Sequence, residues 1–268
     1  MARLDQIISH RFRGFSEYES TLDGLTAALD FGVKQIEFDI RLTHCGTPLI
    51  THDEAARDKR GHLHPICDIH ASDLAALGGD FARMPLAEDV FKAIAAHPNQ
   101  DCLILIDVKD AGFEEMLYAL CAWQGLLDRA IWVSWLPEVI YGLHDIDPEA
   151  RYCLSHWCQN PDEATRAIHA VYDAHLGHID RPSRRYVHGE RSGWFVDGPL
   201  RGALREIVSW VCVPADQISA AFVDDYHQDG IQVSSFSYVT RDAIDAAEAR
   251  YGQDAFFSDA REPFESYR

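Results

Sequence analysis

The sequence predicts a (β/α)8 barrel, in which eight parallel strands alternate with the helices that cover them. Three observations support this fold class: a length of 268 residues, eight strand-like runs, and helical segments with their own start and stop signals between those runs. A doubly wound open sheet would produce a similar string of elements and is the alternative. The predicted strands cover residues 7–10, 33–40, 102–108, 131–134, 152–155, 207–213, 231–236 and 256–258.

The helices are predicted from the residues at their ends. Between the first two strands, leucines recur at helical spacing after Thr21, a capping residue, and before Gly32, which is typical of a helix C-terminus. Four further helices are framed by residues that begin or stop a helix: Gly112 and Gly125, Pro161 and Gly177, Pro214 and Gly230, and Thr240 and Gly252.

Two stretches are too long for short barrel loops, and we expect them to be insertions into a single domain over residues 1–268. The first covers about residues 53–87 and contains a helical piece at residues 71–77. The second covers about residues 178–205 and is loop-like and locally basic. Long excursions in a compact domain are often lids or partner surfaces, and a solvated insertion is the alternative.

The charge balance and the cysteines exclude several classes of partner and location. The chain has 43 Asp and Glu against 24 Lys and Arg, and its net charge of -19 repels nucleic acid and anionic membranes. No apolar stretch approaches the ~20 residues that span a bilayer, so no stable membrane insertion is expected. The seven cysteines include no C-x-x-C pair and indicate free thiols, so the predicted location is the cytoplasm. No particular oligomeric state is indicated.

Acidic residues on the second and third predicted strands indicate a cation site. Glu37 and Asp39 are two residues apart, so on a strand they point to the same face, which in a barrel can be the interior. Asp107, on the neighbouring strand, provides a third carboxylate. Such oxygen ligands suit magnesium, calcium or manganese better than zinc. Taken singly, each acid is more often exposed or half of a salt bridge, but their grouping at strand ends favours a cation.

His10 and His52 are the candidate pair for proton transfer, because imidazole titrates near neutral pH. His10 ends the first strand, and His52 follows the point where the chain returns after the second. Arg11 and Lys109 lie at strand ends and offer positive charge for a phosphoryl oxygen. Most of the 14 histidines are expected to be structural or solvated, and position at strand ends singles out these two.

Several of these residues lie in runs that resemble the signature of the glycerophosphodiester phosphodiesterase family. The spacing between the N-terminal runs agrees with the family without a gap, and the resemblance extends over almost the whole chain. The matching runs are Ser9-His10-Arg11 (H-R-G), Tyr18-Glu19-Ser20-Thr21 (P-E-N-T), Glu37-Phe38-Asp39 (E-x-D), Thr43-His44-Cys45-Gly46 (T-x-D-G), His52-Asp53 (H-D), Asp107-Val108-Lys109 (E-x-K), and Phe257-Ser258-Asp259 (I-T-D).

The resemblance implies a (β/α)8 barrel that uses a divalent cation, magnesium or calcium, to hydrolyse glycerophosphodiesters to glycerol 3-phosphate and an alcohol. In the family's usual route, the glycerol hydroxyl attacks phosphorus and water opens the resulting cyclic phosphate. The resemblance implies that His10 and His52 are the general acid and base, and that Glu37, Asp39 and Asp107 are the metal ligands. It also implies that Arg11 and Lys109 contact the phosphate, and that Glu19 orients Arg11 or His10. Trp135 and Phe236, at strand ends, could stack on a glycerol or sugar unit or pack in the core or rim.

Departures from the family pattern bear on the substrate. Phe12 replaces the glycine of H-R-G, at a position where φ > 0 would be strained and where a bulky ring could narrow the phosphate pocket. Tyr18 and Ser20 replace the proline and asparagine of P-E-N-T. A sugar phosphodiester or a lysophospholipid is therefore the alternative substrate. A non-catalytic phosphoester-binding protein is the alternative of another class, although such a protein has no need of the histidine pair.

Overall fold

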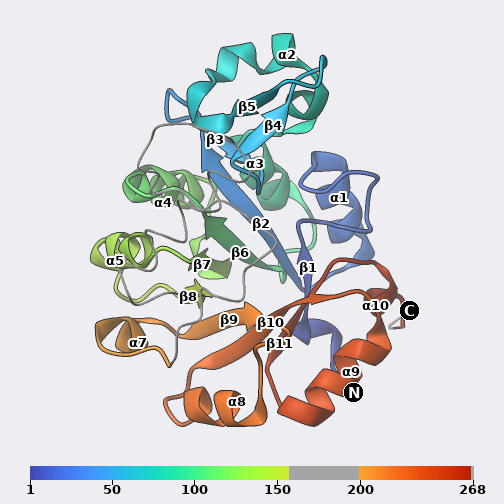
Figure 1. The fold of residues 1–268 in the computed structure, drawn as a ribbon, viewed down its shortest axis with the longest axis vertical. Helices are drawn as coiled ribbons and strands as arrows, with labels where there is room; N and C mark the ends of the chain where they lie inside the picture. The colour runs from blue at the N-terminus through green and yellow to red at the C-terminus, as the bar shows by residue number, and fades with distance from the viewer. Residues whose placement is uncertain (157–198, 267–268) are drawn as a thin grey trace.

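The computed structural model describes residues 1–156 and 199–266, and within these residues the chain forms a closed barrel (Figure 1). The strands pair in parallel in the order β1-β2-β6-β7-β8-β9-β10-β11, and β1 pairs with both β2 and β11. This closure confirms the predicted (β/α)8 barrel and excludes the doubly wound sheet, which would leave two open edges. The strands are β1 (Ile7–His10), β2 (Gln35–Leu42), β6 (Leu103–Val108), β7 (Ala130–Ser134), β8 (Tyr152–Ser155), β9 (Trp210–Pro214), β10 (Gln232–Tyr238) and β11 (Ala255–Ser258).

Along each strand, successive side chains point to opposite faces of the sheet. One set packs with helix side chains in an outer apolar cluster, and the other set forms a smaller apolar cluster inside the barrel. On β6, Leu105 belongs to the inner cluster and Ile106 to the outer one, so Asp107 faces inward. On β2, Phe38 belongs to the outer cluster, so its two acidic neighbours also face inward. Strand periodicity therefore places the predicted acids in the barrel interior.

The helix ends follow the capping residues in several places. The Thr21 side chain accepts a hydrogen bond from the backbone N–H of Gly24 at the start of α1, and Gly32 ends this helix with a φ of 90°. The prediction omits α3 and α5, and the helix predicted from Pro161 to Gly177 lies outside the described residues. The helices are η1 (Leu4–Gln6), α1 (Leu22–Phe31), α3 (Ala87–Ala96), α4 (Glu114–Trp123), η5 (Leu127–Arg129), α5 (Pro137–Ile146), α7 (Ala203–Ile207), α8 (Ala220–His227), α9 (Arg241–Tyr251) and α10 (Glu262–Glu265).

The first predicted insertion forms a small excursion at the top of Figure 1, with a core of its own. The preceding strand β3 (Pro48–Ile50) runs antiparallel to β2. The excursion then contains a hairpin and short helices: β4 (Ala55–Arg57), β5 (Leu63–Pro65), η2 (Ile66–Asp68), η3 (Ala71–Asp73), α2 (Leu74–Leu77) and η4 (Gly79–Arg83). The predicted helical piece at 71–77 is thus a 3-10 turn followed by one turn of α-helix.

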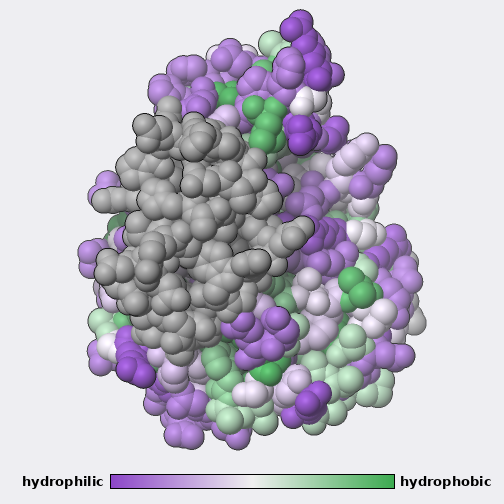
Figure 2. Space-filling view, in the orientation of Figure 1, coloured by the Kyte–Doolittle hydropathy of each residue, from purple (hydrophilic) through white to green (hydrophobic). Residues whose placement is uncertain are grey.

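Of the second predicted insertion, residues 178–198 lie outside the described residues, and α7 begins at Ala203, where a loop was expected. Among the described helices, none combines the length and the apolar character needed to cross a membrane. On the face drawn in Figure 2, hydrophilic residues predominate around the excursion at the top.

Candidate active site

A cavity of about 460 Å³ lies at the carboxyl ends of the barrel strands, where barrel enzymes place their chemistry. Its volume is within the range of small-molecule sites. Glu19 and Trp135 are the predicted site residues that do not line it. Those that do are His10, Arg11, Glu37, Asp39, His52, Asp107, Lys109 and Phe236.

Three carboxyl groups meet inside this cavity. Glu37, Asp39 and Asp107 are buried, and each offers an oxygen within 4.8 Å of the other two. The register between β2 and β6 places Asp39 beside Asp107, and the two-residue spacing puts Glu37 on the same face. The structure therefore brings together the three residues predicted as metal ligands.

Arg11 and Lys109 supply positive charge to this cluster. Lys109 Nζ lies 2.5 Å from Asp107 Oδ2 and 3.0 Å from Asp39 Oδ1. Arg11 Nε lies 3.0 Å from Asp39 Oδ2. Burial raises the pKa of Asp39, but Lys109 and Arg11 outweigh burial and bring this pKa below its ordinary value. Asp39 is therefore an ionised carboxylate between two cations.

The other two acids have raised pKa values. Burial, and then the charge of Asp39, raises the pKa of Glu37 well above its ordinary value. Burial also raises the pKa of Asp107, although Lys109 opposes it. Three acids therefore share two cations, and the cluster lacks enough positive charge to ionise fully.

The cluster fits a divalent cation. Glu37 Oε2 and Asp107 Oδ1 are buried, and neither accepts a hydrogen bond from the residues that the structure describes. Buried carboxylate oxygens without donors are costly unless a cation pairs with them, and they are the ligands that magnesium and calcium prefer. A divalent ion would supply the charge that Arg11 and Lys109 leave uncompensated.

The His10 ring is held by residues from both ends of the chain. Its Nδ1 lies 2.5 Å from Asp259 Oδ1, and its Nε2 lies 3.7 Å from Glu37 Oε2. Arg13 Nη1 contacts Asp259 Oδ1 at 2.9 Å, and Ser237 Oγ donates a hydrogen bond to Asp259 Oδ2 at 2.7 Å. Burial lowers the pKa of His10 more than the hydrogen bond with Asp259 raises it. The ring is therefore oriented, and its neutral form is favoured.

His52 is positioned by a buried ion pair through its backbone. Arg41 Nε donates to the His52 carbonyl at 2.7 Å, and Arg41 Nη1 lies 3.2 Å from Asp110 Oδ1. Asp110 Oδ2 also accepts the Leu42 backbone N–H at 2.8 Å. The His52 ring itself contacts Asp53, with 2.9 Å between Nδ1 and Oδ1. This network ties the segment that bears His52 to the end of β2.

The loop after β1 has positive φ at two consecutive residues, 55° at Arg11 and 60° at Phe12. The expectation that Phe12 narrows the phosphate pocket is wrong. Its ring is fully buried in the outer cluster, 6.0 Å from the Phe38 ring between centroids, and it does not line the cavity. The positive φ turns this side chain into the core, away from the site.

Glu19 lies beside Arg11, which is one of the two contacts expected for it. Glu19 Oε1 is 3.5 Å from Arg11 Nη1, and Glu19 Oε2 accepts a hydrogen bond from Arg13 Nε. No contact between Glu19 and His10 occurs among the described interactions. Glu19 is therefore placed to orient the guanidinium that faces Asp39.

The two predicted aromatic contacts differ in position. Phe236 lines the cavity, with its ring 5.7 Å from the His156 ring, edge to face. Trp135 is buried in the outer cluster, and its ring stacks on the His156 ring, with 6.2 Å between centroids and 5° between planes. Within the described residues, Trp135 therefore borders the cavity through His156 and does not line it.

Among the other residues that line the cavity, sequence reasoning did not assign Arg13, His156, Ser237 and Asp259 to the site. Asp259 had a signal, because it ends the last matching run and follows the last strand. His156 follows β8 directly, so the end-of-strand rule used for His10 could have found it. The pairing of Arg41 with Asp110 had no local signal, because the two residues come from different strand ends.

The model of the glycerophosphoryl diester phosphodiesterase family matches residues 9–262 of the chain. The chain belongs to this family. It is accordingly a phosphoric diester hydrolase, and the predicted family resemblance is confirmed.

Relatives in this family are distant in sequence and similar in fold. Glycerophosphodiester phosphodiesterase 1 of Homo sapiens is 24% identical over 268 residues, covering 91% of this chain and 75% of that protein. A structure from Silicibacter pomeroyi, assigned as a glycerophosphoryl diester phosphodiesterase, has a TM-score of 0.72 at 15% identity and covers 97% of this chain and 92% of its own. An Oleispira antarctica phosphodiesterase was solved in complex with the product sn-glycerol-3-phosphate. It has a TM-score of 0.63 at 18% identity, and the match covers 97% of this chain and 95% of that chain. These structural likenesses support the barrel fold.

Proposed function

We propose that this protein hydrolyses glycerophosphodiesters to glycerol 3-phosphate and an alcohol, with a divalent cation and with His10 and His52 as base and acid. One observation carries the proposal: both imidazoles line the same cavity as the cluster of Glu37, Asp39 and Asp107. The product bound to the Oleispira antarctica relative supports the same product here.

The three acids would hold the cation, which we propose to be magnesium or calcium because all three ligands are hard oxygens. When bound, the cation stabilises charge on the non-bridging phosphoryl oxygens and favours ionisation of a nearby hydroxyl. Arg11 and Lys109 line the same cavity and add positive charge for the phosphoryl group. The chain has a net charge of -19 and repels an anionic substrate at long range. The positive groups inside the cavity must therefore provide the attraction for the phosphate.

His10 is proposed as the base of the first step. When its Nδ1–H donates to Asp259, its Nε2 bears the lone pair and removes the proton from the substrate hydroxyl next to the phosphoester. That hydroxyl oxygen attacks phosphorus, the bond to the alcohol oxygen breaks, and His52 gives a proton to the departing alkoxide. Water then opens the cyclic phosphate with the two roles exchanged, which releases glycerol 3-phosphate.

The test is release of glycerol 3-phosphate from glycerophosphocholine by the purified protein. We expect EDTA to abolish release and magnesium or calcium to restore it. His10→Gln and His52→Gln should each lower the rate about 10²–10⁴-fold while the circular dichroism spectrum is retained. The control His227→Gln changes an exposed histidine that pairs with Asp254 at 2.8 Å, and it should keep full activity. Activity that survives either active-site substitution would contradict the assigned roles.

A second cavity favours a larger substrate, such as a sugar phosphodiester or a lysophospholipid. This cavity of about 260 Å³ shares His52 with the first one. Tyr18 and Ser20, two of the departures from the family pattern, line it together with residues of the excursion. A panel of diesters with glycerol, sugar and lipid moieties tests this point. Faster turnover of the larger diesters, lost in Tyr18→Ala, would support it, and equal rates across the panel would contradict it.

Family membership and the retained histidine pair favour catalysis over the non-catalytic alternative. Phosphodiester binding without turnover at any cation concentration would reverse that preference. We also propose a cytoplasmic location, supported by the free thiols of the six cysteines that the structure describes. The acidic charge supports a small-molecule substrate over nucleic acid.

A further inference from the structure

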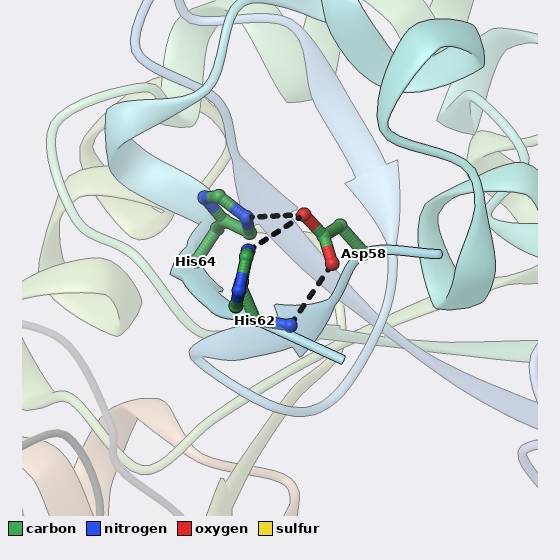
Figure 3. A group of neighbouring side chains, drawn as sticks. All are labelled: Asp58, His62 and His64. Atoms are coloured by element: carbon green, nitrogen blue, oxygen red, sulfur yellow. Dashed lines mark hydrogen bonds and ion pairs between the residues drawn. The ribbon is translucent and has the colours of Figure 1, made fainter. Parts of the chain in front are cut away.

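A second group of metal-ligating side chains lies on the excursion, at the hairpin formed by β4 and β5. Figure 3 shows the carboxylate of Asp58 facing the rings of His62 and His64. None of the three lines either of the two cavities described above. The group is therefore separate from the carboxylate cluster of the barrel.

The distances in this group match the coordination shell of a small ion. Asp58 Oδ2 is 3.1 Å from His64 Nε2 and 3.5 Å from His62 Nδ1, and one ligand atom from each residue lies within 4.8 Å of the others. Metal–ligand bonds of 2.0–2.1 Å in a tetrahedral site separate ligand atoms by about 3.3 Å. The ligand atoms of His62 and His64 also lie within 4.8 Å of each other, and the His62 side chain is 69% exposed, so its ring has room to turn toward a bound ion.

Two of the three side chains are held in place without a metal. Asp58 Oδ1 accepts the backbone N–H groups of Arg60 at 2.8 Å and His62 at 2.9 Å, which fixes the carboxylate at the start of the hairpin turn. The His64 ring packs against the buried Phe81, with 6.1 Å between centroids. A site in which the ligands are already oriented loses less conformational entropy when an ion binds.

The group offers a mixed ligand set. The Asp58 carboxylate supplies an oxygen and the rings of His62 and His64 supply two nitrogens, all within 4.8 Å of one another. Imidazole nitrogen prefers zinc and its transition-metal neighbours over magnesium and calcium.

We propose that Asp58, His62 and His64 form a zinc site in which water supplies the fourth ligand. The ion joins the start of the hairpin turn to β5, and so it stabilises the excursion. Because Ala55 and Ala56 of β4 also line the second cavity, the zinc site supports one wall of that cavity. The chain would therefore hold two ions of different chemistry, a hard cation in the barrel and zinc on the excursion.

The test is calorimetric titration of the purified full chain with zinc chloride in a large excess of magnesium. Magnesium competes at the carboxylate cluster and binds poorly to imidazole, so zinc binding reports the excursion. The variants are His62→Gln and His64→Gln, whose amides can still donate to Asp58 and preserve the turn. His227→Gln is the matched control, because it also removes one histidine that pairs with an aspartate.

We expect one equivalent of zinc to bind the wild type and His227→Gln. Loss of a residue that merely orients a metal ligand typically costs 10–100-fold in affinity, so loss of a ligand should weaken zinc binding by at least about 100-fold. Zinc should also raise the Tm of the wild type and of His227→Gln but not of the two site variants. Equal zinc affinity in all four proteins, or no saturable binding in excess magnesium, would overturn the proposal and leave the group as a surface ion pair.

Discussion

His10 Nδ1 lies 2.5 Å from Asp259 Oδ1, although the two residues are 249 positions apart in the chain. The contact follows from closure of the barrel, because β1 pairs in parallel with β11 and Ser9 lies beside Ser258. The residues that follow these two serines therefore emerge at the same end of the barrel. His10 thus depends on the last strand for its orientation.

The substitution Asp259→Asn should change both the rate and the pH profile. Asp259 raises the pKa of His10 through its hydrogen bond and its charge, while burial and Arg11 lower it. Without the Asp259 carboxylate, the interaction that raises the pKa of His10 is lost, so this pKa falls further. The acidic limb of the pH profile of kcat/KM should therefore move to lower pH. We expect kcat/KM to fall about 10- to 100-fold, a part of the 10²–10⁴-fold typical of a general base.

The control for Asp259→Asn is Asp30→Asn, which breaks a pair with His97 at 3.1 Å; neither residue lines the cavity. It should leave the pH profile unchanged. An acidic limb that stays in place in Asp259→Asn would show that His10 is not the group that titrates there.

The substitution Phe12→Gly should destabilise the protein even though it restores the family's residue. Glycine relieves a positive φ that costs another residue about 1–2 kcal/mol. Removal of a fully buried phenylalanine side chain costs about 3–5 kcal/mol. The cavity term is larger, so urea denaturation should show a net loss of about 1–4 kcal/mol in the free energy of unfolding. A Phe12→Gly variant more stable than the wild type would show that relief of the backbone strain outweighs loss of the buried ring, which is contrary to this prediction.

The substitution Arg41→Met should affect both stability and activity. It leaves the buried Asp110 without the guanidinium that pairs with it, and breaking a buried ion pair costs about 3–5 kcal/mol. It also removes the donor to the His52 carbonyl, so kcat should fall. The control Lys92→Met breaks an exposed pair with Glu88, which solvent screens, so its urea midpoint should stay close to that of the wild type. Similar urea midpoints for the two variants would contradict the prediction.

Cys45 should react as a thiolate at unusually low pH. Hydrogen bonds from the Ala71 backbone and from the Thr43 and Thr47 side chains lower the pKa of this exposed thiol to about 5. Its alkylation by iodoacetamide should therefore level off above about pH 6, whereas an ordinary thiol accelerates up to about pH 9. Peptide mass spectrometry follows the reaction at this residue. Thr47→Val should move the plateau to higher pH, and a rate that rises to pH 9 in the wild type would disprove the assignment.

The strand pattern and the helix caps are local, and the sequence predicted them well. The predicted strands at 7–10 and 152–155 coincide with β1 and β8, and Thr21 and Gly32 bound α1 as expected. The inward direction of the acids on β2 also follows from the two-residue period of a strand. The antiparallel strand β3 and the β4–β5 hairpin were not predicted, because both are too short for a periodic pattern to emerge.

Residue identity and spacing by themselves predicted the barrel class, the family resemblance, and eight of the side chains that gather in the cavity. The tertiary structure alone decided the partners of those side chains: Asp259 for His10, the Arg41–Asp110 pair behind His52, and His156 between Trp135 and the cavity. It also decided that Phe12 faces the core. The physical reason is that sequence periods act over a few residues, whereas these contacts join strand ends that meet only when the barrel closes.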